Sequence, residues 1–262
     1  MRVDVLRGAQ LIPSTRSEIA RFRHRVFVEK LGWHLHASPT CPRPNEGEES
    51  DEYDHDDTVY VTLRGREDAI VGCARLLPAK NRYLLGDHFR HLVDDLRAAV
   101  DVGEAVEAAT NASAGGNYGC ASHVVDTPVW ELSRFAWDQP EPNALNGAGR
   151  EASQGAHELL RAAVFTARAL GARRLIGVTF VSLARLFVRI GVPTHKLGAA
   201  YRIDGRWVAA YRIDIDAQTL TALGLKGAAP EASHTAPWGA PCDVSEVILP
   251  APATASECVS PT

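Results

Sequence analysis

The run Thr58-Val-Tyr-Val-Thr-Leu-Arg64 alternates apolar and polar side chains and is followed, after a short polar turn, by Ile70-Val-Gly-Cys-Ala-Arg-Leu76. Alternation with a period of two is typical of a strand that is buried on one face. The turn Gly65-Arg-Glu-Asp68 is short and polar, so the second run is predicted to pair antiparallel with the first. This hairpin indicates that the fold is built on a sheet.

Further strand patterns follow this hairpin, and then patterns of helices alternate with patterns of strands. Early hairpins followed by this alternation predict an α/β (α+β) protein with one mixed, mostly antiparallel sheet and helices on both faces. Ser14 or Thr15 is the expected cap of the first helix. Strands are predicted at residues 3–6, 129–135, 175–180 and 206–213, and helices at 14–31, 88–96, 153–170 and 183–190.

Composition narrows the function classes. The 262 residues carry a net charge of −4, which argues against a nucleic-acid binder. Five scattered cysteines without a CxxC pair indicate neither a disulfide framework nor a zinc site. No apolar run has the ~20 residues of a membrane helix, so a cytoplasmic protein without a membrane partner is expected. Residues 98–128 resemble an insertion, and the Ala/Pro-rich stretch 216–262 is expected to be a largely disordered extension of a domain spanning 1–215.

An acidic segment precedes the first hairpin strand. Asp51 and Asp54 are three residues apart, so one helical turn would point both the same way. Arg75, near the end of a buried strand, needs a carboxylate partner because an unpaired buried charge is costly. Asp51, Asp54 and Glu131 are the candidates. The earlier acids Glu46, Glu48 and Glu49 are interpreted as a solvated loop. A metal site in residues 54–57 is a rival, but the segment lacks the glycine and spacing of a calcium loop.

Glu131 and Arg134 present a geometrical problem. Strand side chains alternate between faces, so residues three apart should point to opposite sides of the sheet. If both side chains serve one site, a β-bulge must interrupt the strand, and bulges are common beside active sites. The alternative is a plain strand with Glu131 inward and Arg134 outward.

Charged and aromatic residues recur along the chain in a fixed order: Arg23, Phe27, Lys30, Trp33, Asp51, Asp54, Arg75, Phe89, Glu131 and Arg134. In these residues the chain resembles the acyl-homoserine lactone synthases, the autoinducer synthases of bacterial quorum sensing. The resemblance covers about residues 1–215 and implies a fold similar to that of the GNAT acetyltransferases.

The resemblance implies a reaction and a set of roles. An acyl chain from acyl carrier protein is joined to the amine of S-adenosylmethionine, which is a substrate rather than a cofactor, and lactone closure releases methylthioadenosine. Glu131 is the expected base, and no metal is expected. Asp51, Asp54, Arg75 and Arg134 complete the expected catalytic set, and the expected donor-binding residues are Arg23, Phe27, Trp33 and Phe89.

The second half is expected to hold the acyl chain and to meet its carrier. Thr179 matches the family threonine, with Val178 and Leu183 beside it, while Phe180 is expected to shorten or reshape the pocket. Acyl carrier proteins are acidic, so a basic surface is expected to bind them. Its expected members are Arg161, Arg168, Arg174 and Arg185.

Three alternatives stay open on the sequence alone. One is a lactone synthase that uses acyl-CoA. Another is a GNAT-type N-acetyltransferase, for which Gly147-Ala-Gly149-Arg150 is a weak phosphate-binding match. The third is a binding module without chemistry, although such a module would have no need of Glu131.

Overall fold

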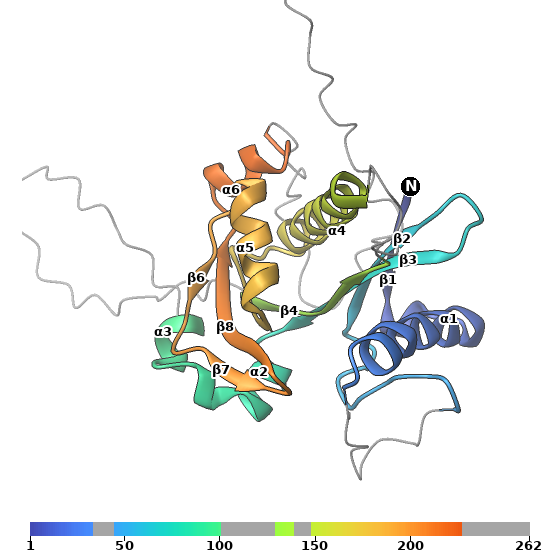
Figure 1. Ribbon diagram of the computed structural model, residues 1–262, viewed down its shortest axis with the longest axis horizontal. Helices are drawn as coiled ribbons and strands as arrows, with labels where there is room; N and C mark the ends of the chain where they lie inside the picture. Colours follow the sequence, from blue (N-terminus) through green and yellow to red (C-terminus); the bar gives the residue numbers. More distant parts are fainter. Residues whose placement is uncertain (34–44, 101–128, 139–147, 227–262) are drawn as a thin grey trace, which may run out of the picture.

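A single sheet organises the chain (Figure 1). The computed structural model describes residues 1–33, 45–100, 129–138 and 148–226. The strands are β1 (Arg2–Arg7), β2 (Val59–Arg64), β3 (Ile70–Pro78), β4 (Val129–Trp137), β5 (Arg174–Phe180), β6 (His195–Lys196), β7 (Tyr201–Ile203) and β8 (Arg206–Asp214). Their order is β1-β2-β3-β4-β5-β8-β6, with β7 also paired to β8. All pairs are antiparallel except β4 with β5. The predicted fold class is confirmed.

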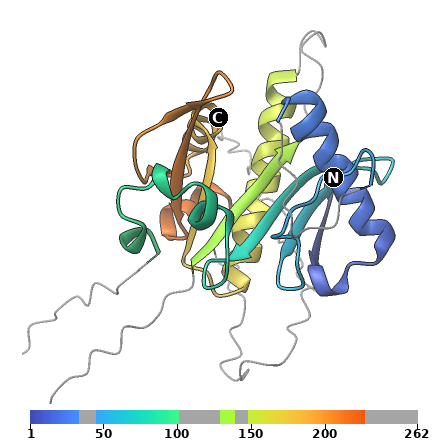
Figure 2. The same cartoon turned by 90° about the horizontal axis from the view of Figure 1, so that it is seen from below.

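Helices cover both faces of this sheet. Figures 1 and 2 show α1 on one face of the β1–β3 strands and α4 on the other. The helices are α1 (Pro13–Arg23), α2 (Leu84–His88), α3 (Leu96–Val100), α4 (Ala148–Ala169), α5 (Val181–Ile190) and α6 (Ala217–Ala222). Among the helices that the structure describes, none combines the length and the apolar run that a membrane crossing requires.

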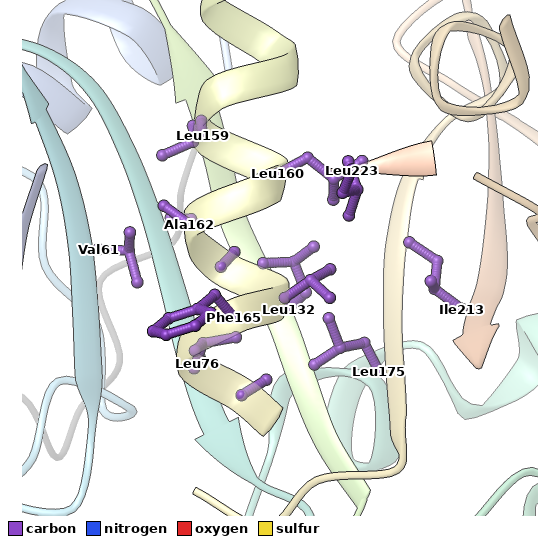
Figure 3. Close-up of a cluster of buried hydrophobic side chains, with 14 of the residues drawn as sticks. Val61, Leu76, Leu132, Leu159, Leu160, Ala162, Phe165, Leu175, Ile213 and Leu223 are labelled. Carbon is purple, nitrogen blue, oxygen red and sulfur yellow. The ribbon is translucent and has the colours of Figure 1, made fainter. Parts of the chain in front are cut away.

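The predicted hairpin forms, and its alternation supplies both cores. In β2, Val61 and Leu63 pack with α4 in the largest apolar cluster, whereas Tyr60 packs with α1 on the opposite face. Figure 3 shows this larger cluster, in which Leu159 and Phe165 of α4 lie against the strands. Because strand side chains alternate, one hairpin anchors a helix on each face of the sheet.

The sheet divides between β4 and β5. These parallel strands pair only from Val129 with Arg174 to Glu131 with Ile176, after which no further register pair joins them. At the end of the pairing the backbones approach closely, since a Cβ on Gly177 would lie 2.3 Å from the carbonyl oxygen of Leu132. Only glycine fits there. Beyond this point the two strands border a cavity.

Three predictions of local structure were wrong. The first helix begins at Pro13 after Ile12, without a side-chain cap, because proline itself suits the first helical position. The helix predicted at 88–96 is replaced by α2, a 3₁₀ turn at Arg90–Leu92 and α3. The short elements β6, β7 and α6 were not predicted, because they are too short to show a period in the sequence.

The C-terminal boundary also needs correction. Asp216 caps α6 by accepting a hydrogen bond from the Thr219 N–H at 2.8 Å. Leu223 and Leu225, just after α6, are fully buried in the main core. The folded domain therefore continues beyond residue 215. Residues 98–100 of the predicted insertion 98–128 belong to α3, and the remainder of that stretch lies outside the described residues, as do residues 227–262.

Candidate active site

The predicted first helix ends in an unusual segment. From His24 to Lys30 the backbone is π-helical, a form that often marks functional sites. The segment continues to Trp33, whose N–H donates to the Phe27 carbonyl at 2.9 Å. The two rings stack with centroids 4.9 Å apart. Phe27 and Trp33 thus form one aromatic surface, which we call the aromatic wall.

Behind this wall lies a network of charged side chains, which we call the charge network. Three arginines meet three carboxylates, so its formal charge is zero. Each of the six is largely buried, with side chains between 0% and 14% exposed. Its members are Arg23, Arg75, Arg134, Glu49, Asp51 and Asp54.

Arg75 is held from three sides. It donates to Asp54 at 2.9 Å, to Asp51 at 3.0 Å and, through Nε, to the Ser133 hydroxyl at 3.0 Å. The prediction that this strand arginine needs carboxylate partners is confirmed for Asp51 and Asp54. Arg23 donates to the same Asp54 oxygen at 2.7 Å.

The interpretation of Glu49 as a member of a solvated loop is wrong. Glu49 is 4% exposed and accepts hydrogen bonds from both Arg23 and Arg134, so it is not part of a solvated loop. Its backbone N–H donates to the Ala20 carbonyl of α1 at 3.0 Å, which brings the acidic segment back onto the helix. That loop-to-helix contact has no sequence signature.

The arginines keep the buried carboxylates ionised. Burial raises the pKa of Asp54, but the charges of Arg23 and Arg75 outweigh burial and place the pKa well below its ordinary value. The pKa of Asp51 and that of Glu49 are lowered in the same way, with arginines again overcoming burial. The Tyr60 hydroxyl also donates to Asp54, at 2.7 Å.

The predicted β-bulge lies at Arg134. Arg75 pairs with Ser133 and Cys73 with Ala136, so two residues of β4 face Ala74 alone. Arg134 has a φ of +49°, in the left-handed region. This turn brings its side chain to Asp51 at 2.9 Å, on the same side of the sheet as Ser133. A plain strand is thereby excluded.

Glu131 stands beside the charge network, with different partners. Its carboxylate accepts the backbone N–H groups of Leu84 and Leu85, each at 2.8 Å, at the start of α2. Burial raises its pKa to about 7, against the lowering effect of the two N–H groups and of Arg75 and Arg134. The carboxyl group is therefore poised to exchange a proton near neutral pH.

A cavity of about 1220 Å³ joins these groups to the second half of the chain. Its lining includes Phe89 and the predicted acyl-pocket residues Thr179, Val178 and Leu183. Val178 packs in the cluster on the α2 side, so Thr179, next in the strand, faces the opposite side. Phe180 reaches the aromatic wall, with its ring centroid 5.8 Å from that of Trp33.

The predicted docking arginines do not share one surface. Arg161 is 3% and Arg174 8% exposed, and Arg174 is engaged with Asp214 and with the carbonyls of α3. Both therefore drop out of the docking prediction. Arg168 is half-buried, whereas Arg185 is exposed on α5. The metal alternative gains no support, because the described residues contain no group of three side chains that could hold an ion.

Comparison with known proteins agrees with this geometry. A family model described as autoinducer synthase matches residues 10–111. The acyl-homoserine-lactone synthase of Ralstonia nicotianae is 41% identical over 228 residues, covering 87% of this chain and 96% of that protein. The chain belongs to the acyl-homoserine-lactone synthase family. The expected family resemblance is confirmed, and the protein is an acyltransferase.

Solved structures extend the comparison of this synthase. The crystal structure of TofI in a ternary complex with an inhibitor and MTA aligns with a TM-score of 0.64 and 41% identity, covering 87% of this chain and 99% of that one. BjaI, described as a CoA-dependent acyl-homoserine lactone synthase with SAM and isopentyl-CoA, aligns with a TM-score of 0.57 and 26% identity, covering 84% and 86%.

Removal of one network carboxylate should destabilise the synthase. We expect Glu49→Gln to lower the free energy of unfolding at pH 7 by about 3–5 kcal/mol, because it breaks a buried ion pair. The folded pKa of Glu49 lies below its unfolded value. Its contribution is therefore complete above the unfolded pKa of about 4.3 and fades as pH falls below it.

Urea unfolding at pH 7 and at lower pH measures this effect. Glu46→Gln is the matched control, since Glu46 is an exposed carboxylate of the same segment. Equal stability of the two variants at pH 7 would contradict the role given to Glu49.

Proposed function

We propose that this synthase transfers an acyl chain from acyl carrier protein to the α-amine of S-adenosylmethionine and closes the lactone with release of methylthioadenosine. The observation that carries the proposal is the position of Glu131. This buried carboxyl group, with a pKa of about 7, lies beside the charge network, and the network members Glu49, Asp51 and Arg134 line the large cavity. This arrangement suits deprotonation of an amine next to a thioester.

The aromatic wall and the charge network would bind S-adenosylmethionine. The faces of Phe27 and Trp33 suit a sulfonium cation and an adenine ring. Asp51 and Asp54 stay ionised at neutral pH and would attract the positive end of the substrate. The buried Nη2 of Arg23 lies 3.9 Å from Asp51 and has no hydrogen-bond partner among the described residues, so the substrate carboxylate would be a suitable acceptor.

Glu131 would act as the general base. An α-ammonium group has a pKa of about 7.7–8.0, close enough to the pKa of Glu131 for efficient proton transfer, directly or through water. The free amine then attacks the thioester carbonyl carbon, the C–S bond breaks and the carrier thiol leaves. The substrate carboxylate next attacks its own γ-carbon, and the C–S⁺ bond breaks to give lactone and methylthioadenosine.

The cavity beyond Glu131 would take the acyl chain. Thr179 and Leu183 line it from β5 and α5, and Leu132 and Phe187 supply apolar surface. Phe180 narrows the side that faces Trp33. Chain selection would therefore depend on a few side chains around the divergence of β4 and β5.

The carrier would dock beside Tyr211, where basic residues gather. The charge of Arg185 lies close enough to Tyr211 to lower its pKa against the larger raising effect of burial. Lys196 is the register partner of Tyr211 in the pairing of β6 with β8. Arg189, one turn beyond Arg185, lines the cavity together with Tyr211. These exposed cations suit an acidic carrier that delivers a thioester to the cavity. Acyl-CoA is the alternative donor, favoured by the likeness to BjaI.

A product assay tests the function as a whole. The full chain, given S-adenosylmethionine and the same acyl group on carrier protein or on CoA, should form methylthioadenosine and acyl-homoserine lactone in equal amounts. We expect a higher kcat/KM with the carrier thioester. Mass spectrometry of both products measures the outcome. Higher kcat/KM with the CoA thioester would contradict the proposed donor.

The base assignment has a pH test. Because Glu131 acts as the carboxylate, kcat/KM should rise as pH increases through about 7. Glu131→Gln should lower kcat by about 10²–10⁴-fold and remove that rise. Stopped assays from pH 6 to 9 measure both effects. A fully active Glu131→Gln variant would refute the assignment.

The docking surface has a charge-reversal test. Arg185→Glu should raise KM for the acyl-carrier substrate about fivefold at low salt, as exposed ion pairs contribute up to about 1 kcal/mol. Added salt should reduce the difference, because exposed charges are screened. Arg66→Glu, on the exposed turn before β3, is the matched control. Identical kinetics for the two variants would place docking elsewhere.

A further inference from the structure

Tyr53 lies within the Asp51–Asp54 turn, yet its side chain leaves the charge network. Asp51 and Asp54 turn toward the arginines, whereas the Tyr53 hydroxyl donates to Asp87 of α2 at 3.0 Å. Tyr53 is 1% exposed, and the guanidinium of Arg75 lies 5.8 Å from its ring centroid. Because Tyr53 is buried and bonded to Asp87, it fixes the distance between the Asp51–Asp54 turn and α2.

The helix that Tyr53 holds is the same one that holds Glu131. The first N–H groups of α2, from Leu84 and Leu85, bind both carboxylate oxygens of Glu131. Asp87 lies at the other end of this five-residue helix and also accepts from the exposed Arg82 at 2.9 Å. The helix is thus tied to the base at one end and to the acidic turn at the other.

Tyr53 also orders the acidic turn through its backbone. Its N–H donates to Asp51 at 3.0 Å, and its carbonyl accepts the Thr58 hydroxyl at 2.6 Å. One residue therefore sets the orientation of a network carboxylate and, through α2, that of Glu131. A second contact, His88 with Glu52 at 3.3 Å, runs parallel to it on the exposed side.

We propose that Tyr53 and Asp87 are positioning residues, which hold α2 so that Glu131 faces the site where Asp51 and Asp54 bind the amine. This inference rests on the proposed role of Glu131 as base. Neither side chain needs to touch the substrate. Their hydrogen bond fixes the position of α2 relative to the Asp51–Asp54 turn. Small displacements of a catalytic group reduce reaction rates strongly.

The effect should appear in the pH profile. The groups that face Glu131 are Arg75 of β3, Arg134 of β4, the α2 N–H groups and Tyr83 before α2. The two N–H groups lower its pKa. If α2 moves, these hydrogen bonds weaken while the arginines stay in place. The rise of kcat/KM with pH should then shift to higher pH.

Tyr53→Phe is the decisive variant, because it keeps the ring beside Arg75 and removes only the hydroxyl. We expect kcat to fall about 10- to 100-fold with KM for S-adenosylmethionine unchanged, and the pH profile to shift upward. Asp87→Ala should have the same effect, and the double variant should be no worse than either alone. Asp87→Asn keeps an acceptor oxygen and should restore most activity.

Arg82→Ala is the control, since it removes the other partner of Asp87 and should leave kinetics unchanged. Circular dichroism establishes that each variant is folded. If Tyr53→Phe and Asp87→Ala keep the wild-type kcat and pH profile while Glu131→Gln is inactive, the positioning role is refuted and the base assignment stands. If Glu131→Gln is fully active, the base assignment itself fails.

Discussion

The structure depends on the balance of charge behind the aromatic wall. Three guanidinium groups and three carboxylates are removed from water together, and each would be costly to bury alone. The elements that supply them, α1, the acidic segment, β3 and β4, are held in place by the requirement that every charge finds its partner. The charge network therefore holds these elements together and also lines part of the cavity.

Glu131 differs from the other buried carboxylates in its hydrogen-bond partners. Glu49, Asp51 and Asp54 contact arginines directly, and their pKa values fall. Among the described residues, Glu131 accepts hydrogen bonds from backbone N–H groups alone, and Arg75 and Arg134 act on it without direct contact, so burial prevails and its pKa rises to about 7. In the proposed mechanism, this difference assigns the ionised acids to binding a cation and Glu131 to accepting a proton.

Two backbone features make this site possible. The left-handed backbone conformation of Arg134 places its side chain on the same face of the sheet as Ser133, whereas regular strand alternation would place it on the opposite face. Gly177 lets β5 approach the Leu132 carbonyl before the strands separate, and the separation leaves room for the cavity. Both residues line or border the proposed site: Arg134 and Gly177 are among the residues that line the cavity.

Sequence patterns predict the strands of the central sheet, the helices α1 and α4, and the need of Arg75 for carboxylate partners. Period-two runs such as residues 58–64 specify strands, and the need of a buried Arg75 for acids pointed to Asp51 and Asp54. Even the bulge at Arg134 followed from spacing, once Glu131 and Arg134 were assigned to one site. These features can be predicted from local sequence because strand alternation and residue spacing depend only on neighbouring residues.

Tertiary contacts determine which charged side chains are buried. Glu49 and Glu46 look alike in sequence, but the contact of the acidic segment with Ala20 buries one and leaves the other exposed. Arg161 and Arg174 look like surface cations, yet the packing of α4 and β5 encloses them. The link from Tyr53 to Asp87 joins residues 34 positions apart and has no pattern. Burial and partnership arise from the folding of distant segments together, so residue type and spacing do not reveal them.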